Sequence, residues 1–227
     1  MQKVAFFDID GTVFRSSLLI ELVEALIEKG IFPQNVRARY AASYAAWKNR
    51  EGTYEAYIDD VVRVFMDTLK GVHYGDFADV GREVVGEQSK RVYRYTRDLI
   101  QDLKGKGYYI VAISQSPKTI LDEFCDSYGF DKVYGRMYEL GPLDSFTGKV
   151  VDEHLIKDKA KIIDRLLAHG GFTLEDSIGV GDTDSDIPLL EKVETPICFN
   201  PNMKLFEIAR QKRWPVIVER KDVVYTI

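Results

Sequence analysis

The chain has 227 residues, of which 45% are hydrophobic and 30% charged, so it is long enough to bury one full core with an insertion. The 31 Lys and Arg residues against 36 Asp and Glu give a formal net charge of −5, without the basic excess typical of a dedicated nucleic-acid binder. Cys125 and Cys198 form neither a disulfide framework nor a zinc-ligand cluster, and they predict a reducing compartment.

The first residues predict no export signal. Only four apolar residues, 4–7, precede Asp8, and this run is too short for the apolar region of a signal peptide. The best other apolar stretch, residues 18–27, carries Glu21 and Glu24, whereas a membrane helix needs about 20 mostly apolar residues. We therefore expect a cytoplasmic protein that does not enter a membrane.

Short apolar runs recur along the chain and predict buried parallel strands. They cover residues 4–7, 108–113, 177–180, 196–199 and 214–218. Helical patterns lie between most of them, at residues 99–104, 119–128, 159–169 and 186–192. Strands that alternate with helices predict an α/β fold with a doubly wound parallel sheet.

Residues 15–86 interrupt this alternation. They contain no convincing strand, and Leu18, Leu22 and Leu26 follow helical spacing. We expect an all-helical insertion there, with residues 1–14 and 87–227 forming the core. A second interruption, at residues 136–151, holds Gly-Pro and Thr-Gly turn signals between alternating residues and predicts a small β-hairpin.

Two acids follow the first predicted strand. Asp8 and Asp10 alternate along a chain that leaves the edge of the sheet where α/β proteins place ligands, and Gly11 and Thr12 follow them. Two carboxylates and a glycine loop suit a metal ion and a phosphate group. A helix cap or a solvated turn is the structural alternative.

A serine and a lysine mark the next two segments. Ser114 and Gln115 follow the strand at 108–113 and offer a hydroxyl and backbone N–H groups to an anion, although an ordinary serine cap gives the same pattern. Lys159 lies at the head of a helix, where a cation opposes the helix macrodipole. We interpret it as a counter-charge for phosphate. A solvated charged turn is the alternative, and it fits Lys157 and Lys161 better.

Three acids crowd into five residues after the strand at 177–180. They are Asp182, Asp184 and Asp186, and their mutual repulsion is unfavourable without a cation. Carboxylate oxygens at this spacing suit Mg²⁺, which takes one or two carboxylates and fills its octahedron with water and substrate phosphate. The start of a capped acidic helix is a compatible structural alternative.

In order and spacing, these four segments resemble the four motifs of the haloacid dehalogenase (HAD) superfamily of phosphohydrolases, across nearly the whole core. The specific parts are Asp8-x-Asp10-Gly11-Thr12 and Gly181-Asp182-x-x-x-Asp186. The resemblance implies a HAD-like, Rossmann-type core with a helical cap between the first and second motifs. Residues 184–191, Asn200-Pro201 and Trp214-Pro215 look like the branch that contains phosphoserine phosphatase.

The resemblance implies a phosphatase that hydrolyses a small phosphorylated metabolite with Mg²⁺. Asp8 would be the nucleophile that forms an aspartyl-phosphate, and Asp10 the general acid and base. The metal would be held by Asp8, the backbone carbonyl of Asp10 and Asp182, with Asp186 acting through water. The phosphate-binding residues would be Ser114, Lys159, Gly11, Thr12 and Gln115.

Two departures from that branch concern the substrate. Ser17 stands where its phosphoserine enzymes carry a Glu that grips the substrate amine, and Glu21, one helical turn later, is the nearest acid. Gln115 and Ser116 replace two glycines of the phosphate loop. Arg63 lies roughly where those enzymes keep a carboxylate-binding arginine, so Arg63 and Glu21 are the substrate candidates of the insertion. We therefore expect that the chain is not a dedicated phosphoserine phosphatase.

Two other functions stay open at this point. The same core can transfer phosphate to another hydroxyl, as in phosphomutases, or it can persist as a catalytically idle binding module. No motif acid is lost, which disfavours the idle module. Several tyrosines and arginines of the insertion, among them Tyr44, Tyr54 and Tyr57, are further candidates to face the site. The sequence leaves the oligomeric state open.

Overall fold

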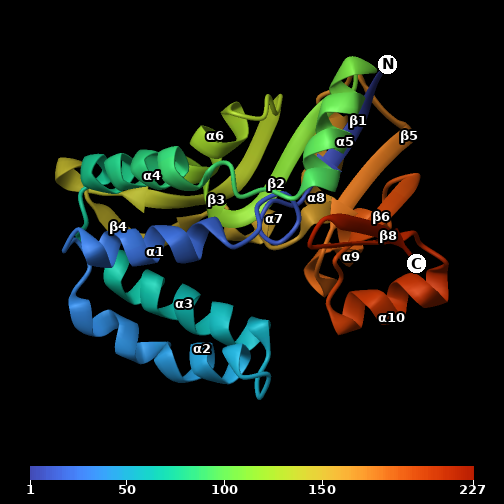
Figure 1. The fold of residues 1–227 in the computed structure, drawn as a ribbon. Helices are drawn as coiled ribbons and strands as arrows, with labels where there is room; N and C mark the ends of the chain where they lie inside the picture. The colour runs from blue at the N-terminus through green and yellow to red at the C-terminus, as the bar shows by residue number, and fades with distance from the viewer.

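The computed structural model describes the backbone of residues 1–227 and every side chain except that of Leu155. One sheet runs through the molecule in the strand order β4-β3-β2-β1-β5-β6-β7-β8 (Figure 1). Its central strands pair in parallel, whereas β3 with β4 and β7 with β8 are antiparallel pairs at its two edges. The mostly parallel sheet confirms the predicted α/β class.

The five predicted strands are all present, and three further strands accompany them. The strands are β1 (Gln2–Phe7), β2 (Tyr109–Pro117), β3 (Lys132–Leu140), β4 (Phe146–Val151), β5 (Phe172–Gly181), β6 (Thr195–Phe199), β7 (Val216–Arg220) and β8 (Val223–Thr226). The predicted hairpin is formed by β3 and β4, in which Leu140 pairs with Phe146. Strand β2 continues to Pro117, so the segment expected to be a loop after residue 113 is extended strand.

Helices of the core connect the strands. They are α5 (Arg94–Gly105), α6 (Lys118–Asp126), α7 (Glu153–Ile156), α8 (Lys159–Ala168), α9 (Ile187–Leu190) and α10 (Met203–Lys212), with the short 3₁₀ turns η2 (Pro142–Asp144) and η3 (Asp184–Asp186). The predicted helix at 186–192 is therefore shorter than expected and starts as a 3₁₀ turn.

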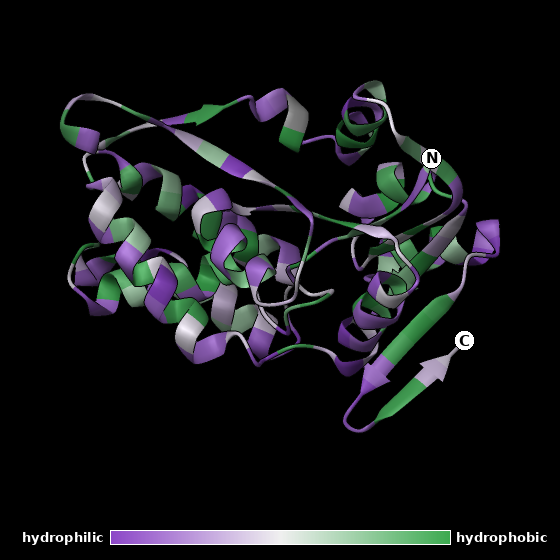
Figure 2. Ribbon diagram, turned by 90° about the horizontal axis from the view of Figure 1, so that it is seen from above, coloured by the Kyte–Doolittle hydropathy of each residue, from purple (hydrophilic) through white to green (hydrophobic). Residues whose placement is uncertain are grey.

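The remaining helices lie between residues 18 and 88, so the expected boundary at residue 86 falls within the last of them. They are α1 (Leu18–Glu28), the 3₁₀ segment η1 (Gln34–Arg39), α2 (Ala41–Lys48), α3 (Tyr54–Leu69) and α4 (Tyr74–Gln88). Figure 2 shows apolar and hydrophilic residues mixed along these helices, as amphipathic helices require. Of all the helices that the structure describes, none has the length and apolar character needed to cross a membrane.

Two apolar clusters lie on opposite faces of the sheet. Alternate residues of a strand point to opposite faces, so Val4 and Phe6 join the cluster beneath α8, α9 and α10, whereas Ala5 and Phe7 join the other one. The second cluster continues without interruption into the insertion, where it includes Phe65 of α3. The insertion and the core therefore share apolar packing.

The β3–β4 hairpin fastens the insertion to the sheet. Phe146 of β4 packs edge-to-face against Phe77 of α4, with ring centroids 5.0 Å apart. The backbone of Phe146 also accepts from the Gly71 N–H at 2.8 Å and donates to the Val72 carbonyl at 2.9 Å. These contacts hold the turn between α3 and α4 against the hairpin.

Candidate active site

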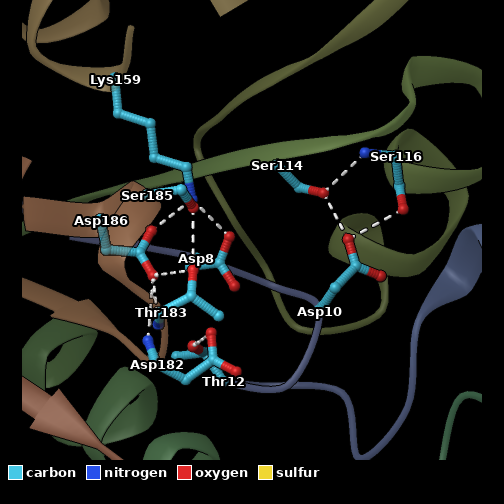
Figure 3. A network of polar contacts seen from close by, with 10 residues as sticks. All are labelled: Asp8, Asp10, Thr12, Ser114, Ser116, Lys159, Asp182, Thr183, Ser185 and Asp186. Atoms are coloured by element: carbon cyan, nitrogen blue, oxygen red, sulfur yellow. Dashed lines mark hydrogen bonds and ion pairs between the residues drawn. The ribbon is translucent and has the colours of Figure 1, made fainter. Parts of the chain in front are cut away.

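The acids and the serine predicted from the sequence meet at the carboxyl ends of three adjacent strands. Asp8 follows β1, Ser114 lies near the end of β2, and Asp182 follows β5 (Figure 3). Because neighbouring parallel strands end at one edge of a sheet, residues far apart in sequence converge there. The site thus has the location at which open α/β sheets bind ligands.

Lys159 is the cation at the centre of this cluster. Its ammonium nitrogen lies 2.5 Å from Oδ1 of Asp8 and 2.5 Å from Oδ1 of Asp186, and only 3% of the residue is exposed. Burial alone would lower the pKa of Lys159, but the charges and hydrogen bonds of Asp186 and Asp8 raise it above its usual value. Lys159 is therefore a fixed positive charge.

Three carboxylates surround this single ammonium. Oxygens of Asp8, Asp182 and Asp186 all lie within 4.8 Å of one another. Burial raises the pKa of Asp8 to about 7, with Lys159 opposing the shift and the Asp186 charge adding to it. Burial, followed by the charges of Asp8 and Asp186, also raises the pKa of Asp182. Ionisation of all three carboxylates would leave negative charge that Lys159 alone does not balance, and hard oxygen donors of this kind fit Mg²⁺.

Asp186 shapes the loop that carries Asp182. Its Oδ2 accepts from the backbone N–H groups of Asp182 and Thr183, both at 3.0 Å, while its Oδ1 accepts from Lys159. The Thr183 side chain completes a capping box with Asp186. Protein donors thus occupy both oxygens of Asp186, so it orients its neighbours as well as contributing charge.

The loop after β1 lies directly against Asp182. A Cβ on Gly11, whose φ is +84°, would come within 2.1 Å of the Asp182 Oδ2 atom. The buried Thr12 hydroxyl donates to the other carboxylate oxygen at 3.2 Å. The Gly11 N–H donates to the carbonyls of Phe14 and Ser16. Gly11 and Thr12 therefore position Asp182 here, and their contact with phosphate stays a prediction.

The carboxylate of Asp10 points towards β2 and away from Asp8 (Figure 3). Its Oδ2 accepts from the hydroxyls of Ser114 at 2.5 Å and Ser116 at 2.8 Å, and its Oδ1 accepts from the Leu18 N–H at 2.6 Å. From the sequence, Ser116 was expected only to replace a glycine of the phosphate loop. Its position two residues after Ser114 is a signal only where the strand continues past residue 113, because residues i and i+2 of a strand share a face.

Gln115 lies between these serines and points to the surface. Its side-chain oxygen accepts from Arg136 of β3 at 2.6 Å, and Arg136 is only 7% exposed. Arg136 was not predicted as a site residue, because it lies in the segment 136–151 that was expected to be a hairpin. A contact of Gln115 with phosphate stays a prediction.

The two substrate candidates of the insertion already have partners. The Arg63 side chain is 67% exposed and lies 2.9 Å from Asp60, one turn earlier in α3. Glu21 forms a 2.9 Å ion pair with Arg91, and its side chain is 21% exposed. Their roles towards a substrate stay predictions.

Another residue of the insertion, Tyr54, comes close to the site. Burial raises the pKa of its phenol above the usual value, as do the charges of Asp10 and Asp182, and its hydroxyl lies beside Ser17. The adjacent Glu55 contacts Lys204 at 3.4 Å. Lys204 in turn binds Asp184 in the loop after β5 at 3.3 Å, which places the start of α3 across the end of β5.

Tyr54 belongs to an aromatic cluster that we define as Tyr44, Trp47, Tyr54 and Tyr57. Trp47 lies 5.4 Å from the Tyr54 ring and stacks on Tyr57 at 5.6 Å, and Tyr44 lies 5.2 Å from Tyr57. Tyr44 and Tyr54 remain partly exposed, whereas Tyr57 is buried. The aromatic cluster therefore extends away from the site along α2 and α3.

Comparisons with known proteins identify relatives that match almost the whole chain. The chain is 26% identical over 224 residues to a histidinol-phosphatase of Neisseria meningitidis, covering 96% of this chain and 99% of that protein. It is 24% identical over 224 residues to a phosphoserine phosphatase of Mycobacterium tuberculosis, covering 95% of this chain and 70% of that protein.

The fold is similar to that of a phospho-aspartyl intermediate analogue of phosphoserine phosphatase, with a TM-score of 0.61 and 21% identity over 97% of this chain and 95% of that one. The family model of haloacid dehalogenase-like hydrolases matches residues 5–191. The chain thus belongs to the haloacid dehalogenase-like hydrolase family and is a phosphatase.

Proposed function

We propose that this phosphatase hydrolyses the phosphomonoester of a small metabolite with Mg²⁺, through an aspartyl-phosphate at Asp8. One observation carries the proposal: the carboxylate oxygens of Asp8, Asp182 and Asp186 lie within 4.8 Å of one another, and the buried ammonium of Lys159 contacts Asp8 and Asp186. Residues 1–14 and 87–227 form the catalytic core in this proposal, and residues 15–86 form its cap.

The chain's own residues divide the reaction into two displacements. Oδ1 of Asp8 faces Lys159, so the other oxygen, Oδ2, is the atom placed to attack phosphorus. The ester P–O bond breaks as an acyl-phosphate bond forms, and Asp10 gives a proton to the departing alcohol oxygen. Asp10 then takes a proton from the water that attacks phosphorus, which releases phosphate and restores Asp8.

Charge balance is the task of the remaining residues. Lys159 and Ser114 bind the non-bridging oxygens of the phosphoryl group and stabilise the charge that they carry in the transition state. Mg²⁺, held by Asp8, Asp182 and the Asp10 carbonyl, would screen the repulsion between the Asp8 carboxylate and the anionic phosphate. Asp186 keeps Lys159 and the Asp182 loop in place.

The alcohol portion of the substrate is proposed to lie against the aromatic cluster. Tyr54 reaches the site from that cluster, and aromatic faces bind flat rings and cations. Ser17 offers no charge to a substrate amine, and Glu21 is already paired with Arg91. These features favour histidinol phosphate, the substrate class that the name of the Neisseria relative indicates, over O-phosphoserine.

The test is phosphate release from a panel of phosphomonoesters that includes histidinol phosphate and O-phosphoserine, with Mg²⁺ and after EDTA treatment. We expect turnover only with Mg²⁺, and a higher kcat/KM for histidinol phosphate. Unchanged turnover after EDTA would refute the metal requirement. A preference for O-phosphoserine of about a hundredfold or more would refute the substrate assignment and make Glu21 the residue to mutate.

The role of the aromatic cluster has its own test. Tyr54→Ala should lower kcat/KM for the preferred substrate by about tenfold or more, because a ring contact is lost at the site. Tyr225→Ala removes a partly exposed ring on the distant strand β8 and serves as the control. Phosphate transfer to another hydroxyl and an idle binding module have no observation of their own in their favour.

A further inference from the structure

The contacts of Asp10 reveal an additional residue for the proposed acid and base step. Two hydroxyls donate to one of its oxygens, Oδ2: that of Ser114 at 2.5 Å and that of Ser116 at 2.8 Å. Both serines are almost completely buried, at 1% and 4% exposure. The Leu18 N–H donates to the other oxygen at 2.6 Å. Asp10 is thus held from β2 and from the start of α1 at the same time.

The arrangement depends on the extension of β2. Because this strand continues to Pro117, Ser114 and Ser116 project from one face while Gln115 projects to the surface. The Ser116 N–H also donates to the Ser114 hydroxyl oxygen at 2.9 Å. The Ser114 oxygen accepts in that bond, and its single proton is the one that it donates to Asp10.

In the proposed reaction Ser114 has two possible acceptors, Asp10 and the phosphate, whereas Ser116 has only Asp10. A hydroxyl carries one proton, so Ser114 cannot donate to Asp10 and to a phosphate oxygen together. When Ser114 turns to phosphate, Oδ2 of Asp10 loses one of its two donors and keeps the bond from Ser116. The vacated direction on Oδ2 then becomes available to the oxygen of the departing alcohol or to the attacking water.

We propose that Ser116 is a positioning residue whose hydroxyl keeps the Asp10 carboxylate in place when Ser114 binds phosphate. This inference rests on the proposed function, because it assigns Asp10 the proton transfers of both displacements. It also gives a role to the serine at position 116, because a glycine there would have no hydroxyl to donate to Asp10. Ser116 acts through Asp10 and need not touch the substrate.

The test compares esters that differ in their need for a proton. An alkyl phosphate needs Asp10 to protonate the departing alcohol, whereas p-nitrophenolate leaves without a proton. Ser116→Ala should lower kcat/KM for an alkyl phosphate by about 10- to 100-fold and that for p-nitrophenyl phosphate by less than about threefold. Ser116→Thr keeps the hydroxyl and should recover most of the alkyl activity, with KM little changed in both variants.

Ser177→Ala is the matched control. Ser177 is also buried, and in the middle of β5 its hydroxyl makes two hydrogen bonds, to the Leu174 carbonyl and from the Glu194 N–H. Its loss should affect both esters alike. If Ser116→Ala does not fold, Ser116→Cys replaces the hydroxyl by a weak donor of similar shape and gives the same comparison.

Each outcome bears on a separate claim. Equal losses on both esters, an effect confined to KM, no recovery in Ser116→Thr, or unchanged activity would each overturn the role of Ser116. In all of these cases the wild-type enzyme still hydrolyses phosphate esters. If the wild-type enzyme hydrolyses none of the panel, it is the proposed function that fails, and this inference falls with it.

Discussion

At the scale of single residues, the main feature of the site is that it has three carboxylates and one ammonium close together. Lys159 pairs with Asp8 and Asp186, yet Asp182 adds a third, half-buried carboxylate whose direct donor is the Thr12 hydroxyl. Burial of like charges is costly unless each has a partner. The cluster is therefore built to receive positive charge, which accounts for the affinity for Mg²⁺ that we propose.

Lys159→Ala should abolish detectable turnover and lower the free energy of unfolding by about 3–5 kcal/mol, because it leaves buried carboxylates without their cation. Lys157→Ala and Lys161→Ala remove exposed lysines that pair with Glu153 and Asp158, and they should change little. Chemical denaturation and phosphate release measure the two effects. If Lys157 were instead the sensitive position, the third motif would be misplaced by two residues.

Some residues of the site could be predicted from the sequence, and others could not. Asp8, Asp182 and Lys159 could be named because each follows or precedes a recognisable element and carries a charge. The side-chain partners of Asp10 could not be named, since they depend on β2 continuing past residue 113. Tyr54 was one of several tyrosines in the insertion, and nothing in its spacing says that its hydroxyl lies beside Ser17.

At the scale of elements, the loop between β1 and α1 sets the position of Asp182. Gly11→Ala should reduce turnover at least about a hundredfold, because its Cβ would overlap the Asp182 Oδ2 atom that lies 2.1 Å away. Gly107→Ala is the control, since Gly107 has a similar φ of +80° but no atom within 4 Å of its Cβ.

Both glycine variants should lose about 1 kcal/mol of stability from backbone strain. Thermal melting checks this shared loss, and phosphate release checks the difference in activity between them. Similar activity in Gly11→Ala and Gly107→Ala would show that the contact of Gly11 with Asp182 does not matter for catalysis.

The elements themselves could be predicted in part. The five strands found from the sequence carry continuous apolar runs. Two strands were missed for different reasons: the parallel part of β3 has only Val133 and Tyr134 as half-buried apolar residues, and β8 has a short apolar run but is a largely exposed edge strand. Edge strands gain their stability from a neighbour, which a sequence pattern does not display.

At the scale of the whole molecule, the insertion and the core are joined by one apolar cluster and by the hairpin contacts of Phe146. The end of the insertion nearest the site, by contrast, meets the core at Lys204, which is exposed and bridges Glu55 to Asp184. Surface ion pairs of this kind are weak. Movement that admits a substrate is therefore expected at the start of α3 and not at α4.

The stability of the molecule should depend on pH and Mg²⁺ together. Asp8 has a pKa of about 7 in the folded state against 3.8 as its ordinary value, so the folded state binds its proton more tightly. Without metal, this contribution is therefore present at low pH and is lost as pH rises towards 7. Mg²⁺ binds the ionised carboxylates, so it should raise Tm more at about pH 8 than at about pH 6.

Thermal melting at both pH values, with Mg²⁺ and with EDTA, measures this dependence. Asp8→Asn should show a smaller fall in Tm between about pH 6 and about pH 8 without metal, because the titrating group is gone. A larger effect of Mg²⁺ at the lower pH, or none at either, would contradict the assignment of the acid cluster as the metal site.

The covalent intermediate at Asp8 is the central claim, and it is tested most directly by trapping. The enzyme is mixed with its best substrate from the panel, quenched in acid within the first turnover, reduced with borohydride and digested for peptide mass spectrometry. We predict a reduced side chain at Asp8 and at no other residue, and none in Asp8→Asn. Rapid phosphate release with Asp8 unmodified, or modification of a different residue, would contradict the account.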